Sequence, residues 1–241
     1  DSHFNLENYD LALSNYEQSL EIASHADSEK SSNRARDIAD CYFELEDFEK
    51  SIYAHEKCLK FQLEYLEYDS PDIAITFRDI GYCYFNLEEY ELASQYIRDC
   101  LEIQLSALDA NDPLIAQTYE SLCDAFFNLE DHETEENYLY QLLEKQKSIH
   151  GEVHKSIGDI YQNIAISLGN RGNHDGAVSF FYKALETYSK SSKGVTKDIA
   201  QTYKQLGKGY DFYGDDIEAF SHYQKSLSLY KYTIIDLSFI M

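Results

Sequence analysis

The residues of this chain that are best suited to chemistry are its eight histidines and five cysteines. His150 and His154 stand four residues apart, the spacing at which two imidazoles on one helix can share a metal ion. Gly151 lies between them in a predicted loop, and no third ligand is evident. His132 and His174 are separated by about 42 residues, a distance typical of structural repeats, which favours a packing or capping role. We therefore predict no metal site and no cofactor.

The cysteines recur with the same spacing as these last two histidines. Cys41 and Cys83 are one such pair, Cys58 and Cys100 are another, and Cys123 falls where the equivalent segments carry alanine or glycine. Residues that recur with a fixed period are most simply explained by packing. Equivalent positions on neighbouring packed helices lie roughly 10 Å apart, which is too far for a disulfide. We therefore predict buried free thiols and a cytoplasmic, reducing location.

Motifs of enzymes are missing from the sequence. It contains no glycine-rich phosphate loop, no Cys-x-x-Cys pair and no Gly-x-Ser-x-Gly elbow. Acidic pairs occur throughout the chain, so they single out no catalytic site. We predict that this chain is not an enzyme.

The elements that carry these residues repeat along the chain. Similar short segments recur with a period of about 42 residues, and only the first step is slightly shorter. A period of roughly 20–50 residues predicts a solenoid, in which each unit buries its apolar face against its neighbours. The segments begin at Asn5, Glu44, Asn86, Asn128, Asn170 and Phe212.

Each repeat is predicted to hold two helices. The first helix carries a small residue that allows the second to approach closely, at Ala39, Gly81, Cys123, Ala165 and Gly207. Good N-cap residues precede the second helix, at Asn8, Asp47, Glu89, Asp131, Asn173 and Asp215. Ser70-Pro71 and Asp112-Pro113 each place a cap residue before a proline, so they begin a first helix.

This pattern of small and aromatic residues resembles the tetratricopeptide repeat. The usual unit has about 34 residues, and the longer unit here resembles the subtype of kinesin light chains and nephrocystin-like proteins. Asn111-Asp-Pro-Leu-Ile-Ala is similar to that family's His-Pro-x-Val-Ala start, with Asp in place of His, and Tyr161 to Tyr188 is the most similar stretch. The resemblance implies an all-α, right-handed superhelical solenoid of antiparallel helix pairs.

The predicted array covers residues 1–232. A partial first repeat spans 1–30, and the full repeats span about 31–70, 71–112, 113–154, 155–196 and 197–232. Glu135 and Leu142 stand where small residues are usual, so the fourth repeat departs most from the pattern. The apolar residues 233–241 leave the repeat frame and are expected to form a capping segment or the start of a further element. Because the chain opens within a repeat, we expect it to be a piece of a longer protein.

The charge balance restricts the partners. The chain has 20 basic and 44 acidic residues, a net charge of −24. Nucleic-acid binding needs clustered Lys and Arg, and an acidic membrane surface would repel this chain. No apolar run approaches the roughly 18 residues that span a membrane. We therefore expect a protein or peptide partner of basic or polar character, although the acidic residues also suit a solvated convex face.

The family resemblance implies that the first helices line a concave groove. The groove positions that the family implies form two sets. The first set is not part of our candidate site and comprises Glu44, Ile75, Gln117, Asp159, Ile166, Gln201 and Asp211. The second set is the candidate peptide-binding site. That set comprises Asn33, Arg36, Asp40, Phe43, Arg78, Tyr82, Phe85, Asn86, Glu120, Asp124, Phe127, Asn128, Gln162, Asn170, Lys204 and Lys208, together with Asn163, which is adjacent to a groove position.

The candidate residues predict a charge pattern along the groove. The roles of the recurring phenylalanines and asparagines stay open. Glu120, Asp124 and Asp159 would form an acidic centre between basic ends that contain the arginines and lysines. The phenylalanines, which recur once per repeat, either pack between first helices or form a ladder of apolar anchors for a peptide. The recurring asparagines either cap their helices or bond to a peptide backbone.

The leading hypothesis is a non-catalytic protein–protein interaction scaffold that binds a peptide segment of its partner in the concave groove. One alternative is a regulatory sensor whose solenoid tightens on a short ligand. Another is a structural module that self-associates through its apolar C-terminal end.

Overall fold

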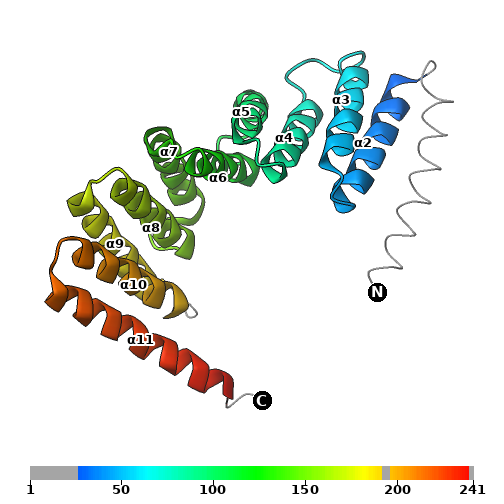
Figure 1. Cartoon of the computed structure of the whole chain (residues 1–241). Helices are drawn as coiled ribbons and strands as arrows, with labels where there is room; N and C mark the ends of the chain where they lie inside the picture. Colours follow the sequence, from blue (N-terminus) through cyan, green and yellow to red (C-terminus); the bar gives the residue numbers. More distant parts are fainter. Residues whose placement is uncertain (1–26, 192–195, 239–241) are drawn as a thin grey trace. The chain divides into compact units, whose positions relative to one another are not determined.

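The described part of the chain is helical. The computed structural model describes residues 27–191 and 196–238, with side chains as far as Lys231, and these ranges contain helices and no strand. The predicted all-α class is therefore confirmed (Figure 1). The helices are α2 (Ser28–Glu44), α3 (Phe48–Gln62), α4 (Pro71–Asn86), α5 (Tyr90–Ala107), α6 (Pro113–Asn128), α7 (His132–His150), α8 (Lys155–Asn170), α9 (His174–Lys190), α10 (Thr196–Phe212) and α11 (Asp216–Ser238).

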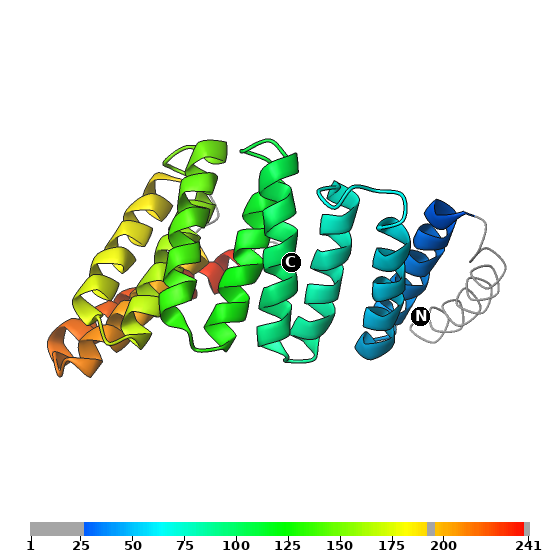
Figure 2. The ribbon, with the colours of Figure 1, turned by 90° about the horizontal axis from the view of Figure 1, so that it is seen from above.

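The described helices form two compact halves, which divide between Leu129 and Glu130. In the N-terminal half α2 packs on α3, α3 on α4, α4 on α5 and α5 on α6. In the C-terminal half α7 packs on α8, α8 on α9, α9 on α10 and α10 on α11. Each half is thus a stack in which a helix contacts mainly its neighbours in sequence, as a repeat array requires (Figure 2).

Two predicted segments are described only in part. The partial first repeat, 1–30, lies outside the described residues except for 27–30. The apolar segment 233–241 is described only as helical backbone to Ser238, at the end of α11. The predicted repeat boundaries at the two ends therefore stay predictions.

Local sequence signals explain where the helices begin. The side chains of Asp47, Asp131 and Asn173 each accept a hydrogen bond from the backbone N–H three residues later, at 3.3, 3.1 and 3.1 Å. Glu89 occupies the equivalent place but its side chain makes no capping bond, consistent with the preference for shorter side chains at N-caps. Prolines at the first turn begin α4 and α6, as expected.

The turn inside each repeat contains a residue with left-handed backbone. Its φ is 58° at Glu46, and it is positive at the equivalent residue of every later repeat. The backbone N–H of Asp47 bonds back to Tyr42 O at 2.9 Å, which closes the end of α2 in a Schellman-type arrangement. Glycine adopts this conformation freely, whereas other residues are strained there. The equivalent residues are Glu88, Glu130, Gly172 and Gly214.

The predicted small residue does allow close approach of the paired helices. A Cβ atom on Gly81 would lie 2.7 Å from Cγ1 of Ile97 on α5, and one on Gly207 would lie 2.6 Å from Cδ1 of Tyr223 on α11. Real Cβ atoms essentially never come so close to other atoms. The side chains of Ala39 and Ala165, at the equivalent positions, are fully buried.

Buried polar contacts join each repeat to the next. Thr76 Oγ1 donates to Gln62 Oε1 at 2.8 Å, and one repeat later Thr118 Oγ1 donates to Gln104 Oε1 at 2.7 Å. Each glutamine lies near the end of a second helix and each threonine near the start of the following first helix. Because buried polar groups are costly without partners, these pairs favour one stacking of neighbouring repeats.

All five cysteines are buried free thiols, as predicted. Burial raises the pKa of Cys83 and of Cys100 to about 11. Thiolates are the reactive species, so these side chains serve packing.

The fourth repeat accommodates its unusual residues locally. The side chain of Glu135 is buried, and His132 Nδ1 lies 2.9 Å from its carboxylate. Leu142 is buried too, with 2% of its surface exposed. Both unusual residues of α7 are therefore buried, and the fourth repeat remains packed around them.

Candidate functional site

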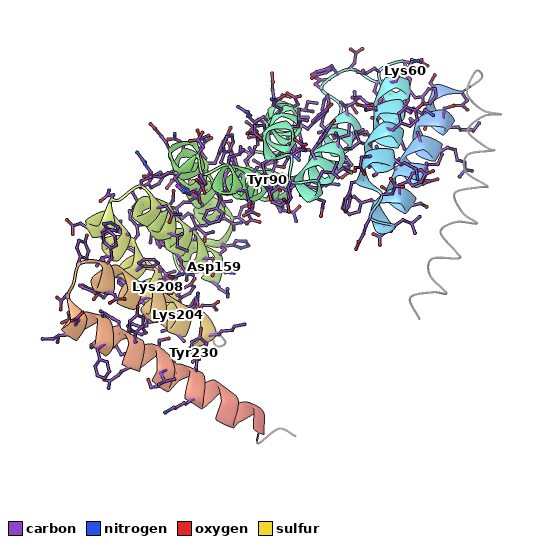
Figure 3. The ribbon with its side chains drawn as sticks, in the orientation of Figure 1. Lys60, Tyr90, Asp159, Lys204, Lys208 and Tyr230 are labelled. Carbon is purple, nitrogen blue, oxygen red and sulfur yellow. The ribbon has the colours of Figure 1, made fainter. Side chains whose placement is uncertain are left out.

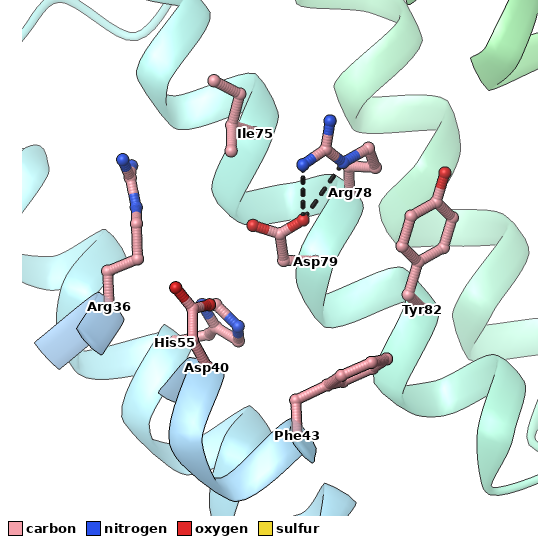
Figure 4. A pocket seen from close by; sticks show the side chains of 8 residues that line it. All are labelled: Arg36, Asp40, Phe43, His55, Ile75, Arg78, Asp79 and Tyr82. Carbon is pink, nitrogen blue, oxygen red and sulfur yellow. Dashed lines mark hydrogen bonds and ion pairs between the residues drawn. The ribbon is translucent and has the colours of Figure 1, made fainter. Parts of the chain in front are cut away.

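The N-terminal half contains a cavity of ≈ 320 Å³ to which α2, α3 and α4 contribute side chains (Figure 4). Five of the predicted groove residues line it, as does the neighbouring groove position Ile75. Two further lining residues, His55 and Asp79, were missed. The complete lining is Arg36, Asp40, Phe43, His55, Ile75, Arg78, Asp79 and Tyr82.

Helix periodicity brings these side chains together. Arg36, Asp40 and Phe43 are spaced by four and three residues, so they share one face of α2. Ile75, Arg78 and Tyr82 are spaced by three and four residues, so they share one face of α4. Because α3 packs against both helices, these two faces border the same space.

The wall of the cavity formed by Arg78, Asp79 and Tyr82 is held by contacts among these side chains. Nε and Nη2 of Arg78 donate to Asp79 Oδ1 at 3.0 and 2.8 Å, so these charges largely compensate each other. The guanidinium also lies 5.8 Å from the centre of the Tyr82 ring. Tyr82 in turn shares a hydrogen bond of 3.2 Å with Ser121 on α6. This wall is therefore largely preorganised.

Arg36 is less well satisfied than Arg78. Its Nη2 donates at the long distances of 3.4 Å to Asp72 O and 3.5 Å to Thr76 Oγ1. Its Nε is buried without a hydrogen-bond partner among the described residues. The pKa of Asp40, one helical turn away, is raised by burial and by the charge of Asp79, and lowered by Arg36. Arg36 thus retains donor capacity beside an acceptor.

His55 reaches the cavity from the second helix of the repeat. Its side chain is 1% exposed, and its Nδ1 has no hydrogen-bond partner among the described residues. Its pKa is lowered to about 4, chiefly by burial and also by Arg36 and Arg78, with Asp79 acting in the opposite direction. The imidazole is therefore neutral at pH 7. The equivalent residues of the later repeats are Ile97, Leu139, Phe181 and Tyr223, so this break in the repeat was the signal that could have revealed it.

The three recurring phenylalanines do not behave alike. Phe43 packs edge-on against Phe48 with ring centres 5.4 Å apart, and Phe85 packs in the same way against Tyr90 at 5.2 Å. Phe127 is 44% exposed. The first two side chains stabilise the turn inside their repeats, and Phe43 also lines the cavity.

The recurring asparagines bond to their own helices. Asn86 Nδ2 donates to Tyr82 O at 2.8 Å, and Asn128 Nδ2 donates to Asp124 O at 2.7 Å. These contacts match the helix-capping interpretation. Asn170 lies at the same place in α8 and is exposed.

The remaining acidic candidates lie in different halves. Glu120 and Asp124 lie on α6 and are exposed, whereas Asp159 lies on α8 in the C-terminal half (Figure 3). Asp159 is already engaged, because Lys155 Nζ lies 3.0 Å from each of its carboxylate oxygens and Tyr188 donates to it at 2.7 Å.

The other predicted residues are mostly exposed on their helices. Gln162 is an exception, because its Oε1 accepts a hydrogen bond from Thr202 at 2.9 Å and so joins α8 to α10. Lys204 and Lys208 lie on α10 in this half (Figure 3). The exposed candidates are Asn33, Asn163, Lys204 and Lys208.

Residues 27–191 and 196–238 contain no group of three or more His, Cys, Asp or Glu side chains placed to hold a metal ion. The rings of His150 and His154 stack with centres 4.3 Å apart, and His154 caps α8. None of the described helices combines the length and the apolarity needed to cross a membrane.

Comparison with known proteins identifies a repeat family. A family profile described as tetratricopeptide repeat matches residues 1–64 and 156–231, and a second profile with the same description matches residues 79–106. No curated protein matches the chain.

Several solved structures share the fold. BtubC (BKLC) of P. vanneervenii is 19% identical with a TM-score of 0.69, over 93% of this chain and 92% of that one. The TPR-like repeats of a kinesin light chain from Podosopora anserina are 16% identical with a TM-score of 0.69, over 83% and 95%. YrrB, a TPR protein described as having an unusual peptide-binding site, is 15% identical with a TM-score of 0.58, over 89% and 91%.

Proposed function

Because this chain belongs to the tetratricopeptide repeat family, we propose that it is a non-catalytic protein–protein interaction scaffold that binds a peptide segment of its partner along the first helices of its repeats. Proteins of this family are generally scaffolds without catalytic activity. Among the similar structures, YrrB is described as having a peptide-binding site. The cavity beside α2 and α4 is the part of the proposed surface with the best-defined geometry.

The observation that carries the proposal is the pairing of an unsatisfied donor with an acceptor in that cavity. Arg36 has a buried Nε without a partner among the described residues, and the Asp40 carboxylate lies one turn further along α2. A peptide group or a carboxamide both accepts and donates hydrogen bonds, so it matches the chemistry of both side chains. Phe43, Ile75 and Tyr82 supply apolar surface for an adjacent side chain.

The charges favour a partner of basic or polar character with apolar anchors. The net charge of −24 attracts basic segments at long range. Within the cavity two arginines face two aspartates, so a neutral polar group is favoured there over a full charge. We place this interaction in the cytoplasm, where the five free thiols would stay reduced.

A peptide selection followed by titration tests the proposal. Peptides selected from a random displayed library would be titrated against the chain and against Arg36→Ala. The matched control is Arg34→Ala, because Arg34 lies on the same helix but pairs with Asp37 at 3.3 Å and lies outside the cavity lining. We expect about tenfold weaker binding for Arg36→Ala, which corresponds to about 1.4 kcal/mol. The Arg34→Ala variant should bind within about twofold of the original chain.

Equal losses in the two arginine variants would contradict a site at the cavity. So would peptides that bind Arg36→Ala as tightly as they bind the original chain.

A further inference from the structure

Large apolar side chains are exposed around the turn between α10 and α11. Phe212 ends α10 and is 71% exposed, and Tyr213 follows it at 47%. Ile217 and Phe220 lie at the start of α11 and are 82% and 62% exposed. We call these four residues the turn patch.

Two residues of the turn patch, Phe212 and Ile217, depart from the repeat. Phe212 stands where the earlier repeats carry polar residues, namely Glu44, Asn86, Asn128 and Asn170. Ile217 stands where they carry acidic residues, namely Glu49, Glu91, Glu133 and Asp175. All eight of those equivalent residues are exposed, so the repeat itself gives no packing reason for apolar side chains there.

Stacking of a further helix pair would not cover these two positions. The repeat made of α4 and α5 contacts α3 on one side and α6 on the other, yet its Asn86 and Glu91 stay exposed. The repeat made of α8 and α9 contacts α7 and α10, and its Asn170 and Asp175 are exposed as well. Positions that stay exposed in a repeat with neighbours on both sides face away from the stack. Phe212 and Ile217 occupy these positions.

The aromatic part of the turn patch is held in place. The Phe212 ring lies 4.1 Å from the His174 ring, and the Tyr213 ring lies 5.4 Å from it, measured between centres. Tyr213 also donates a hydrogen bond of 3.1 Å to Asp175. A preordered surface loses little conformational entropy on binding, which suits a docking site.

Acidic residues alternate with these apolar ones along the chain. Asp211, Asp215, Asp216 and Glu218 are interleaved with the patch in sequence, and all four are exposed. Asp215 also caps α11, accepting from the backbone N–H of Glu218 at 3.2 Å. An apolar surface with an acidic border is complementary to apolar side chains flanked by Lys or Arg.

We propose that the turn patch binds a basic amphipathic helical segment of a partner protein. Its apolar side chains contact Phe212 and Ile217, and its Lys or Arg side chains face the acidic border. A second copy of this chain is disfavoured as the occupant, because each copy carries a net charge of −24 and would bring a second acidic border. This site is independent of the cavity at Arg36.

The test uses a fluorescent amphipathic peptide of leucine and lysine, five helical turns long, and a scrambled peptide of the same composition. Both are titrated against the chain and against the double variant Phe212→Asn, Ile217→Glu. The new residues are those found at the equivalent positions of other repeats, so the fold is expected to tolerate them. The variant also carries one more negative charge, so a loss of affinity for a cationic peptide reports the apolar contact.

We expect the double variant to bind the amphipathic peptide about tenfold more weakly, since it removes two large apolar contacts. The scrambled peptide should bind the original chain weakly and the variant equally weakly. Tyr53→Glu is the matched control, because Tyr53 is 60% exposed on α3 and its change should leave binding unaltered.

Three results would overturn the proposal. The first is equal affinity of the double variant and the original chain for the amphipathic peptide. The second is equal binding of the scrambled peptide. The third is a dimer in sedimentation that the double variant abolishes, which would assign the patch to a second copy of the chain.

Discussion

Replacing His55 by leucine should remove a loss of stability that this chain suffers on acidification. In the folded chain burial lowers the pKa of His55 from 6.5 to about 4. The unfolded chain therefore takes up this proton near pH 6.5, whereas the folded chain resists it until about pH 4. Between these values the unfolded state binds more protons, so the free energy of unfolding falls as the pH falls.

The magnitude follows from the distance between the two pKa values. At about 1.4 kcal/mol per pH unit, the interval from 6.5 to about 4 amounts to about 3 kcal/mol. The contribution is fully present above pH 6.5 and lost toward pH 4. Leucine occupies the equivalent place in α7, at Leu139, so it should pack without a titrating group.

Urea denaturation followed by circular dichroism, between pH 4.5 and 7.5, measures the effect. The carboxylates contribute to the pH dependence of both proteins, so the difference between the chain and His55→Leu isolates the histidine. His150→Gln is a matched control, because it also removes one imidazole, here an exposed one. In parallel, an NMR titration of the histidine ring protons should show that the His55 imidazole stays neutral below pH 5.

Two observations would refute the reasoning. One is the same pH dependence in the chain and in His55→Leu. The other is a His55 resonance that titrates near pH 6.5, which would mean that water reaches the imidazole.

Three further predictions concern the repeat itself. Glu88→Gly should raise the free energy of unfolding by about 0.5–1 kcal/mol, because Glu88 has a φ of 61° and glycine adopts that conformation without strain; urea denaturation that shows a loss would contradict it. Gly158→Ala should lower the free energy of unfolding by about 1–3 kcal/mol, because the added Cβ would lie 2.6 Å from Cδ1 of the buried Tyr188 ring; unchanged stability would mean that the ring can move away. An aromatic disulfide reagent should modify none of the cysteines quickly in the native chain and all five in urea, since all are buried and thiolates react; rapid labelling of the native chain would show local opening.

Periodicity predicted much of the fold because its signals are local. A cap residue such as Asp131 acts on a backbone N–H three residues away, and a small residue such as Gly81 acts on the helix directly opposite. Both kinds of signal recur in successive repeats, so each copy supports the others. The helix starts, the close approach of paired helices and the buried thiols could therefore be predicted from the sequence.

The candidate site was predicted less completely. The family resemblance placed Arg36 and Arg78 among the groove positions, and both line the cavity. It could not show that Asp79 compensates Arg78, because that ion pair depends on side-chain rotamers. His55 lies on a second helix, whereas the family pattern directs attention to first helices. Asn86 recurs once per repeat and bonds to its own helix. Its spacing alone could not distinguish this bond from one to a peptide backbone.

Photo-crosslinking of a selected peptide tests the central claim most directly. A peptide from the library selection would carry a photoreactive diazirine beside its apolar anchor, and the crosslinked residues would be located by mass spectrometry. A peptide bound at the cavity should crosslink to α2 and α4, at residues such as Phe43, Ile75 and Tyr82. At peptide concentrations below the dissociation constant, Arg36→Ala should reduce these crosslinks about tenfold. Crosslinks confined to α5, or crosslinks on α2 that are undiminished in Arg36→Ala, would contradict the account.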